Sequence, residues 1–354
     1  MRRKILAVLA VLLLGAVASF YWTTRPLPVL TVATSPGSYE RAQAAAMMHP
    51  YGAANGKDVR PAFFDGGVTD LSRAVSAHAY PGDVIDLELP DAIEACRTGL
   101  LEKIDSASLP PGQDGTPAAK DFVPGAIGPC WVGSIVYSHA IIFGQFAGPQ
   151  PQSLGDFFDR TKFPGRRALP PGPKYNLEMA LLADGVAPKD VYATLATDAG
   201  VERALKKLER LGPIAWSSSS EAVTLVKSGG AAMAVALNQD IYDARLPNVI
   251  WDRQLYELDV FAVPTGDPKK DLAMDFVRFA TGSAPLAGVA SWVPYGPARH
   301  SALALVGDNP ELHIPMTPWL STAHFGTAFA VDDAWWQAHG PMLAARWEAW
   351  AQTH

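Results

Sequence analysis

Two acidic residues, Glu257 and Asp259, stand directly before a short apolar run in the segment YELDVFAVP, residues 256–264. The run is typical of a β-strand, and alternate side chains of a strand point to the same side. Glu257 and Asp259 can therefore share one face of the strand. Carboxylates in such a place can act in catalysis, bind a cation or form local ion pairs, and the rest of the sequence has to distinguish these roles.

The residue patterns of common enzyme classes are missing from the sequence. The eight histidines show no His-x-x-x-His spacing for a metal ion. The segment GAANGK, residues 52–57, is one residue short of a phosphate loop and is followed by Asp58. The serine run 217–220 has no Gly-x-Ser-x-Gly pattern around it and is typical of a helix N-cap, with Glu221 in the first turn. We therefore expect no enzymatic activity, no metal site and no cofactor.

The N-terminus predicts export from the cytoplasm. Three basic residues at positions 2–4 precede an apolar run over residues 5–17, and Ala16-Val17-Ala18 is the small-x-small pattern that a signal peptidase cuts. We expect a signal peptide over residues 1–18. An uncleaved membrane anchor over residues 5–22 is the alternative. Either interpretation places the rest of the chain in the periplasm.

The sequence holds two cysteines, Cys96 and Cys130. An even number of cysteines in an exported protein favours a disulfide over a metal site or a catalytic thiol. Closing this loop would stabilise the fold by about 3 to 4 kcal/mol in the chain-entropy model. Two buried free thiols are the alternative.

The charge of the chain argues against binding to nucleic acid or to anionic lipid. The formal net charge is −6, and removal of residues 1–18, which hold three basic and no acidic side chains, brings it to −9, with 26 basic and 35 acidic side chains. Such a protein is mildly suited to a cationic ligand. The 336 residues that follow position 18 exceed one comfortable hydrophobic core, so we expect two domains.

Strand and helix patterns alternate along the chain. Residues 29–34 (VLTVAT) predict a strand that is followed, after a tight loop, by a helix over residues 39–48. A second strand is expected over residues 83–87 before a helix at 90–99, and a third over residues 231–237 after a helix at 220–227. This alternation predicts an α/β fold with largely parallel sheets. Ligands bind beyond the carboxyl ends of such strands, which nominates the loops 35–39, 86–88 and 238–240.

Eight stretches of the sequence carry a family resemblance. Four of them are LTVATSPGSYERAQ (30–43), GPCWVGSIVYS (128–138), EAVTLVKSGGAAMAVALNQDIYDA (221–244) and LDVFAVPTGDPKKDLAMDFVRFA (258–280), and the others are residues 82–105, 153–169, 172–192 and 293–305. Together, in this order, they resemble the periplasmic solute-binding proteins of bacterial ABC importers, in the spermidine/putrescine-binding branch. The resemblance covers essentially the whole chain after residue 18.

The resemblance implies a type II periplasmic binding fold, in which two α/β lobes are joined by two crossing hinge strands. The crossings are expected near residues 132–137 and 258–263. Lobe 1 would then comprise residues 27–133 and 259–310, and lobe 2 residues 134–258. Residues 311–354 would form a C-terminal helical segment that packs on the lobes.

The resemblance also implies a function. A binding protein of this family captures a small polar solute in the cleft between the lobes and delivers it to a permease in the inner membrane, usually as a monomer. In polyamine binders an acid at the position of Asp259 pairs with a ligand ammonium group. The resemblance therefore favours a polyamine-like solute or another amine. A membrane-anchored sensor, or a binder of an amino acid or a carboxylate, is the alternative. The ligand-binding residues that we expect are Ser35, Ser38, Tyr39, Glu88, Trp131, Ser134, Tyr175, Asn238, Asp240, Glu257, Asp259 and Tyr295.

The sequence departs from the polyamine-binding pattern at several of these places. Leu237 and Glu257 stand where aromatic residues are common, and the loop after the first strand has Ser35 and Pro36 instead of an aromatic residue. A second acid from lobe 2 is also missing, since residues 172–176 offer Lys174, Tyr175 and Asn176. These departures favour a smaller or differently charged solute, and for an anionic solute Lys174 or Arg299 would be the residue to test.

Overall fold

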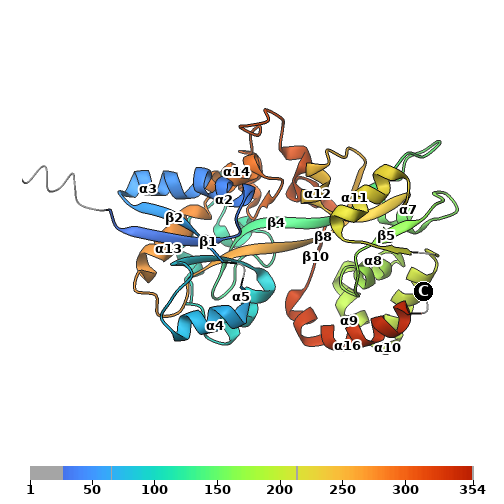
Figure 1. The fold of residues 1–354 in the computed structure, drawn as a ribbon, viewed down its shortest axis with the longest axis horizontal. Helices are drawn as coiled ribbons and strands as arrows, with labels where there is room; N and C mark the ends of the chain where they lie inside the picture. Colours follow the sequence, from blue (N-terminus) through green and yellow to red (C-terminus); the bar gives the residue numbers. More distant parts are fainter. Residues whose placement is uncertain (1–26, 65, 213, 353–354) are drawn as a thin grey trace, which may run out of the picture.

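The structure is a computed structural model that describes residues 27–64, 66–212 and 214–352 (Figure 1). The predicted signal peptide and the alternative anchor over residues 5–22 lie outside the described residues. Within the described ranges, no helix is both long enough and apolar enough to span a membrane. The chain forms two α/β halves on either side of two long strands, β4 and β8 (Figure 1).

The first half is built on three parallel strands. β1 (Val29–Thr34) pairs with β2 (Asp58–Phe63) and with β3 (Val84–Glu88). Its helices include α2 (Ser38–Gln43), α3 (His49–Asn55), α4 (Val68–Ser76), α5 (Leu89–Arg97), α13 (Lys270–Ala280) and α14 (Ser283–Trp292). The helix predicted over residues 39–48 continues to Asn55 but contains a π-helical turn, η1 (Ala44–Met48), which the sequence did not indicate. A Cβ on Gly288 would lie 2.7 Å from the Ala46 Cβ, so α14 packs closely against this turn.

The second half repeats the same plan. β5 (Arg167–Leu169) pairs in parallel with β6 (Ile214–Trp216) and with β7 (Met233–Leu237). Its helices include α7 (Leu154–Phe158), α8 (Asn176–Ala183), α9 (Val191–Leu195), α10 (Asp198–Glu209), α11 (Ser219–Ser228) and α12 (Asn238–Asp243). At the start of α11 the side chains of Ser218 and Glu221 form a capping box, which confirms the N-cap predicted for the serine run.

The strands β4 (Val132–Phe143) and β8 (Val249–Ala262) join the halves. They are antiparallel to each other, and the continuous strand order is β2-β1-β3-β8-β4-β7-β5-β6. Each strand contributes to two separate hydrophobic cores: Val136 and Leu258 to the first half, Ile141 and Leu255 to the second. β4 and β8 therefore form the common floor between two independently packed bodies.

Cys96 and Cys130 form the predicted disulfide, with their Cα atoms 5.8 Å apart. Cys96 lies in the last turn of α5 and Cys130 lies two residues before β4. The bond therefore ties a helix of the first half to the start of a crossing strand.

The C-terminal segment contacts both halves. After β10 (Phe329–Ala330), which pairs with β8, the helix α16 (Asp333–Ala351) packs on the second half with Trp336, Leu343 and Trp347 buried. Near its start, the Gln337 side chain donates a 2.5 Å hydrogen bond to the Pro90 carbonyl of α5. This contact spans the space between the two halves at one edge of the crossing strands.

Candidate functional site

One face of the crossing strands is polar. In the β-sheet register Glu88 of β3 lies opposite Asp259 of β8, and Tyr137 of β4 lies opposite Glu257. Asp86 precedes Glu88 by two residues, so all five side chains point to the same side of the sheet. The other face carries Tyr256 and Leu258, which are buried in the core of the first half. The alternation of β8 thus separates an apolar face from an acidic one.

Asp86 is held by three neutral donors, two from α2 and one from β4. Its Oδ2 accepts hydrogen bonds from the Tyr39 hydroxyl at 2.6 Å and from Gln43 Nε2 at 2.5 Å. Its Oδ1 accepts one from the Ser134 hydroxyl at 3.0 Å, and Ser134 lies at a β-bulge that interrupts the register of β4. Burial raises the pKa of Asp86 to about 6, although these three bonds act in the opposite direction. The residues around Asp86 therefore stabilise its charge only in part.

Asp259 has a buried carboxylate oxygen with no hydrogen-bond partner, Oδ1. Burial, followed by the charges of Asp86, Glu88 and Glu257, raises the pKa of Asp259 well above the usual carboxyl range. Among the described residues, no lysine or arginine forms an ion pair with Asp86, Glu88 or Asp259. A buried polar atom without a partner calls for an explanation, and here a cation from outside the chain would provide one.

Three tyrosines lie within electrostatic reach of Asp259. The rings of Tyr39 and Tyr295 meet edge to face with their centroids 5.6 Å apart. Burial first, and the negative charge of Asp259 among the further causes, raises the pKa of Tyr39 and Tyr137 well above the usual value and that of Tyr295 to about 12. The phenols therefore stay neutral and offer aromatic faces, which attract organic cations. Positions 237 and 257, where polyamine binders commonly have aromatic residues, are Leu and Glu in this chain. The three tyrosines supply aromatic rings from other positions.

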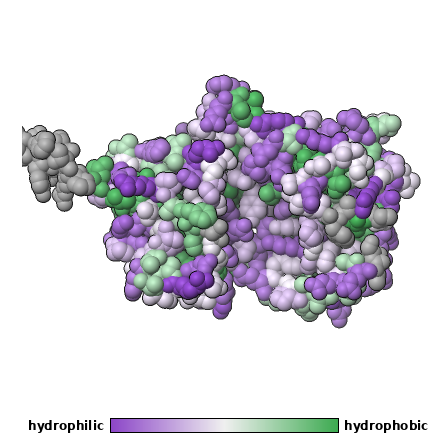
Figure 2. All heavy atoms as spheres, viewed as in Figure 1, coloured by the Kyte–Doolittle hydropathy of each residue, from purple (hydrophilic) through white to green (hydrophobic). Residues whose placement is uncertain are grey.

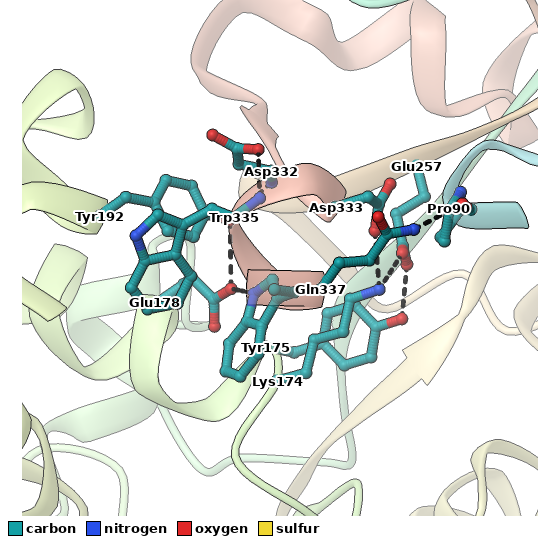
Figure 3. A network of polar contacts seen from close by, with 11 residues as sticks. Pro90, Lys174, Tyr175, Glu178, Tyr192, Glu257, Asp332, Asp333, Trp335 and Gln337 are labelled. Carbon is teal, nitrogen blue, oxygen red and sulfur yellow. Dashed lines mark hydrogen bonds and ion pairs between the residues drawn. The ribbon is translucent and has the colours of Figure 1, made fainter. Parts of the chain in front are cut away.

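The opposite end of the acidic face is organised around Lys174, as Figure 3 shows. Lys174 Nζ forms ion pairs with Glu257 and, at 2.9 Å, with Asp333 at the start of α16. Burial alone would lower the pKa of Lys174, but the two carboxylates outweigh it and raise that pKa. Burial and the charge of Glu257 raise the pKa of Asp333 to about 7. This end of the face thus has a cation that the protein itself supplies.

Tyr175 lies between Lys174 and the crossing strands. Its hydroxyl donates a 2.5 Å hydrogen bond to Glu257 Oε2, and its ring lies 4.1 Å, centroid to centroid, from the ring of His139. Tyr175 has a φ of 71°, a left-handed value that is rare for a bulky residue and that is often found at ligand sites. Burial lowers the pKa of His139 to about 4, so its ring is neutral, and its buried Nδ1 has no partner.

The structure brings together seven of the twelve predicted ligand residues: Tyr39, Glu88, Ser134, Tyr175, Glu257, Asp259 and Tyr295. Ser35 lies before α2 and Ser38 is its first residue, and both are exposed. Asp240 is half-buried on α12, and its charge is among the causes that raise the pKa of Tyr295. Both polar atoms of the Asn238 side chain form hydrogen bonds within the fold. Its Oδ1 accepts from the Ser138 N–H at 3.0 Å, and its Nδ2 donates to the Pro294 carbonyl.

Trp131 lies at the edge of the site. Its indole N–H donates to the Gly125 carbonyl at 3.1 Å, and the ring lines a cavity of about 850 Å³ whose wall also includes Glu257, Leu258 and Asp333. This cavity opens between the halves along the edge of β8, and Figure 2 shows the surface indented between them. Arg299 is fully buried within the first half and bonds to Asp121, so it cannot meet a solute in the cleft.

Sequence reasoning missed Gln43, Tyr137, His139 and Asp333 as members of the site. Asp86 lies in the predicted ligand loop 86–88 but not among the expected ligand residues, although it precedes Glu88 by two residues in the strand. Tyr137 and His139 follow Ser134 in the expected crossing, but only the register of β4 against β8 shows which of its residues face the acids. Asp333 is brought to Lys174 from 159 positions away, and no local pattern indicates this contact.

Comparisons with known proteins agree with this architecture. The family model described as bacterial extracellular solute-binding protein matches residues 46–314. A gamma-aminobutyric acid-binding protein of Pseudomonas aeruginosa is 34% identical over 329 residues, which cover 91% of this chain and 90% of that protein.

Solved structures of binding proteins are also similar to this chain over most of its length. The structure of the Atu4243 GABA receptor matches with 26% identity and a TM-score of 0.72, over 92% of this chain and 98% of that one. An ABC transporter substrate-binding protein from Bradyrhizobium japonicum matches with 25% identity and a TM-score of 0.73, over 91% and 99% of the two chains.

Proposed function

Since the chain belongs to the family of bacterial extracellular solute-binding proteins and serves an ABC transporter, we propose that its cleft captures a small solute with a protonated amine. The observation that carries this proposal is the buried, unpartnered Oδ1 of Asp259. An ammonium group beside it would satisfy that oxygen and offset the repulsion from Asp86 and Glu88, which the structure otherwise leaves uncompensated. The tyrosines nearby favour an organic ammonium ion over a hydrated metal ion.

We favour an ω-amino acid such as 4-aminobutanoate over a polyamine. Two similar proteins are named for binding gamma-aminobutyric acid. In this chain Lys174 lies at the opposite end of the acidic face from Asp259, where it could approach the carboxylate of such a solute. The polyamine expected from the sequence remains the second candidate, because the cleft gathers five carboxyl groups, those of Asp86, Glu88, Glu257, Asp259 and Asp333, around one lysine.

We further propose that the protein works as a monomer in the periplasm, exported by residues 1–18, and delivers its solute to an inner-membrane permease. The two separate cores, joined by β4 and β8, favour closure by rotation of two lobes with the boundaries predicted from the sequence. Scattering measurements with and without solute test this closure, and an unchanged radius of gyration would count against it.

A thermal-shift and calorimetric screen tests the choice of solute. The panel holds 4-aminobutanoate, 1,4-diaminobutane, spermidine and succinate, the last as a dianion of similar length without an amine. A solute at a hundredfold its dissociation constant should add about 2.7 kcal/mol of stability. We expect stabilisation by 4-aminobutanoate and none by succinate. Stabilisation by succinate alone would overturn the amine-binding proposal.

A further inference from the structure

Lys174 places an ammonium group of the protein at one end of the cleft. The residue precedes α8, and its Nζ lies between Glu257 of β8 and Asp333 of α16 (Figure 3). Its side chain is 29% exposed, while those of its two partners are 2% and 1% exposed. The amine is therefore fixed against buried carboxylates, on a side chain that is itself only partly buried.

The two ends of the acidic face differ in how their charge is neutralised. At the Asp259 end, Asp86, Glu88 and Asp259 form no ion pair with a lysine or arginine of the described residues, although the charge of Lys174 acts on Glu88. At the Glu257 end, Lys174 pairs directly with Glu257 and Asp333. Glu257 and Asp259 are alternate residues of one strand, so their Cα atoms are about 7 Å apart. The two nitrogens of a short α,ω-diamine are a similar distance apart, so such a solute could extend from one of these residues to the other. One of the two, Glu257, is already paired with Lys174.

We propose that Lys174 is a specificity-determining residue that takes the position of a second ligand ammonium group, so that the cleft accepts solutes with one ammonium group and rejects α,ω-diamines and polyamines. The inference rests on the proposed amine-binding function. A diamine held at Asp259 would bring its second ammonium towards Lys174 Nζ, and like charges placed together across an interface are strongly unfavourable. A solute that has a carboxylate or a methyl group at that end meets no such repulsion.

A matched pair of ligands isolates this effect. Calorimetry on the full mature protein compares 1-aminobutane with 1,4-diaminobutane, which differ by one ammonium group. We expect the wild-type protein to bind 1-aminobutane at least tenfold more tightly. In Lys174→Met the charge is removed and the length of the side chain is kept, so the ratio of the two affinities should shift towards the diamine by about 10- to 100-fold.

Two further variants control for a merely structural role. Lys174→Arg keeps the charge and should keep the wild-type ratio. Lys270→Met breaks an ion pair of the first half, in which Lys270 Nζ lies 2.6 Å from Glu102, and should also leave the ratio unchanged. If Lys174→Met does not fold, Lys174→Met combined with Asp333→Asn removes a carboxylate that would be left unpaired, and the same shift in ratio is expected.

The outcomes separate this inference from the function on which it rests. An unchanged ratio in a folded Lys174→Met protein, or equal wild-type affinities for the two ligands, would overturn the role of Lys174 and leave amine binding intact. Failure of the wild-type protein to bind any of the amines, including 4-aminobutanoate, would overturn both.

Discussion

Asp121 and Asp259 are both buried carboxylates, but their surroundings differ. Asp121, at the end of α6 (Ala118–Asp121), pairs with Arg299 at 3.1 Å and accepts hydrogen bonds from the N–H and the hydroxyl of Ser301 at 2.8 and 2.6 Å. Arg299 in turn donates to the Thr281 and Pro110 carbonyls. Asp259 has a buried oxygen with no partner and three other carboxyl groups close by.

This difference separates a structural role from a binding role. In a buried ion pair whose polar atoms are all hydrogen-bonded, removal of either partner leaves a buried charge unpaired and destabilises the fold. A buried carboxyl group without a cation is destabilised in its charged form, and a cation that arrives from outside would stabilise that form. The predictions below test this contrast, from the largest expected effect to the smallest.

Loss of the paired carboxylate, that of Asp121, should cause the largest loss of stability. Asp121→Asn leaves the Arg299 charge buried and unpaired, which should lower the free energy of unfolding by about 3 to 5 kcal/mol. Urea denaturation followed by tryptophan fluorescence measures this change. As a control, Glu202→Gln removes an exposed pair with Lys206, whose side chains are 54% and 65% exposed, and should cost less than about 1 kcal/mol. A loss below 1 kcal/mol for Asp121→Asn would contradict the structural role.

Loss of the unpaired carboxylate should affect binding instead of stability. Asp259→Asn keeps the shape but leaves a desolvated ligand ammonium without its partner, which should weaken amine binding by about 2 to 5 kcal/mol, or roughly 30-fold to several thousandfold. The free energy of unfolding of the empty protein should change little, because the raised pKa of Asp259 keeps its carboxyl group protonated there and the substitution removes no charge. Calorimetry and urea denaturation give the two values.

A carboxylate on the same strand provides the control for Asp259. Asp252 of β8 accepts a 3.0 Å hydrogen bond from the Leu154 N–H, at the start of α7, and Asp252→Asn should leave the affinity unchanged. If Asp259→Asn keeps its affinity for an amine within twofold of the wild type, Asp259 is not the residue that holds the ammonium group.

Amine affinity should increase with pH. The pKa of Asp86 is about 6, and that of Asp259 lies well above its usual range, so both hold protons in the empty protein that an ammonium ligand would displace. The ligand amine stays protonated up to about pH 10. Affinity should therefore rise as pH increases through about 6, by up to about tenfold per pH unit for each proton released. Calorimetry in two buffers with different ionisation enthalpies counts these protons, and affinity that falls between pH 5 and 8 would contradict the assignment.

The raised pKa of Asp86 should also make the empty protein less stable as pH increases. Asp86 binds its proton more tightly in the folded protein than in the unfolded chain, where a carboxyl pKa is about 4. Its contribution to the stability of the empty protein is therefore lost as pH rises from about 4 through about 6. Asp86→Asn should remove this part of the pH dependence of unfolding, which the denaturation curves of the two proteins at several pH values would show.

Local patterns predicted much of the fold. The strand expected over residues 29–34 is β1, Val29–Thr34, and the serine run forms the N-cap of α11 because a hydroxyl and an acid three residues later bond to the same turn. The shared face of Glu257 and Asp259 followed from the alternation of a strand. The cluster around them could not be predicted in this way. Tyr175 reaches Glu257 across 82 residues, and this contact depends on how the second half packs against β8.

The surroundings of single side chains depend on such contacts too. Trp131 directly precedes β4, and its indole donates to the Gly125 carbonyl while its ring lines the cavity that Glu257 and Asp333 also line, which nothing in its neighbours in sequence indicates. Asn238 follows β7 at the carboxyl end where ligands bind, but its amide is taken up by Ser138 and Pro294. A single sequence predicts which residues lie near a cleft. Whether their polar atoms are free to bind a solute depends on contacts made over long distances in the chain.

The smallest effect on amine binding should come from loss of the aromatic ring of Tyr295, near Asp259. Tyr295→Leu removes the ring that meets Tyr39 edge to face and should weaken amine binding by about 0.5 to 2 kcal/mol, which is the range of a cation–π contact and corresponds to roughly 2- to 30-fold. Tyr295→Phe is the matched variant, since it keeps the aromatic face and removes only the hydroxyl. Calorimetry with 1-aminobutane should therefore rank the wild type and Tyr295→Phe together, above Tyr295→Leu. Equal losses in both variants would mean that the hydroxyl, and not the ring, contacts the solute, so that Asp259 would hold the ammonium group without help from the aromatic face.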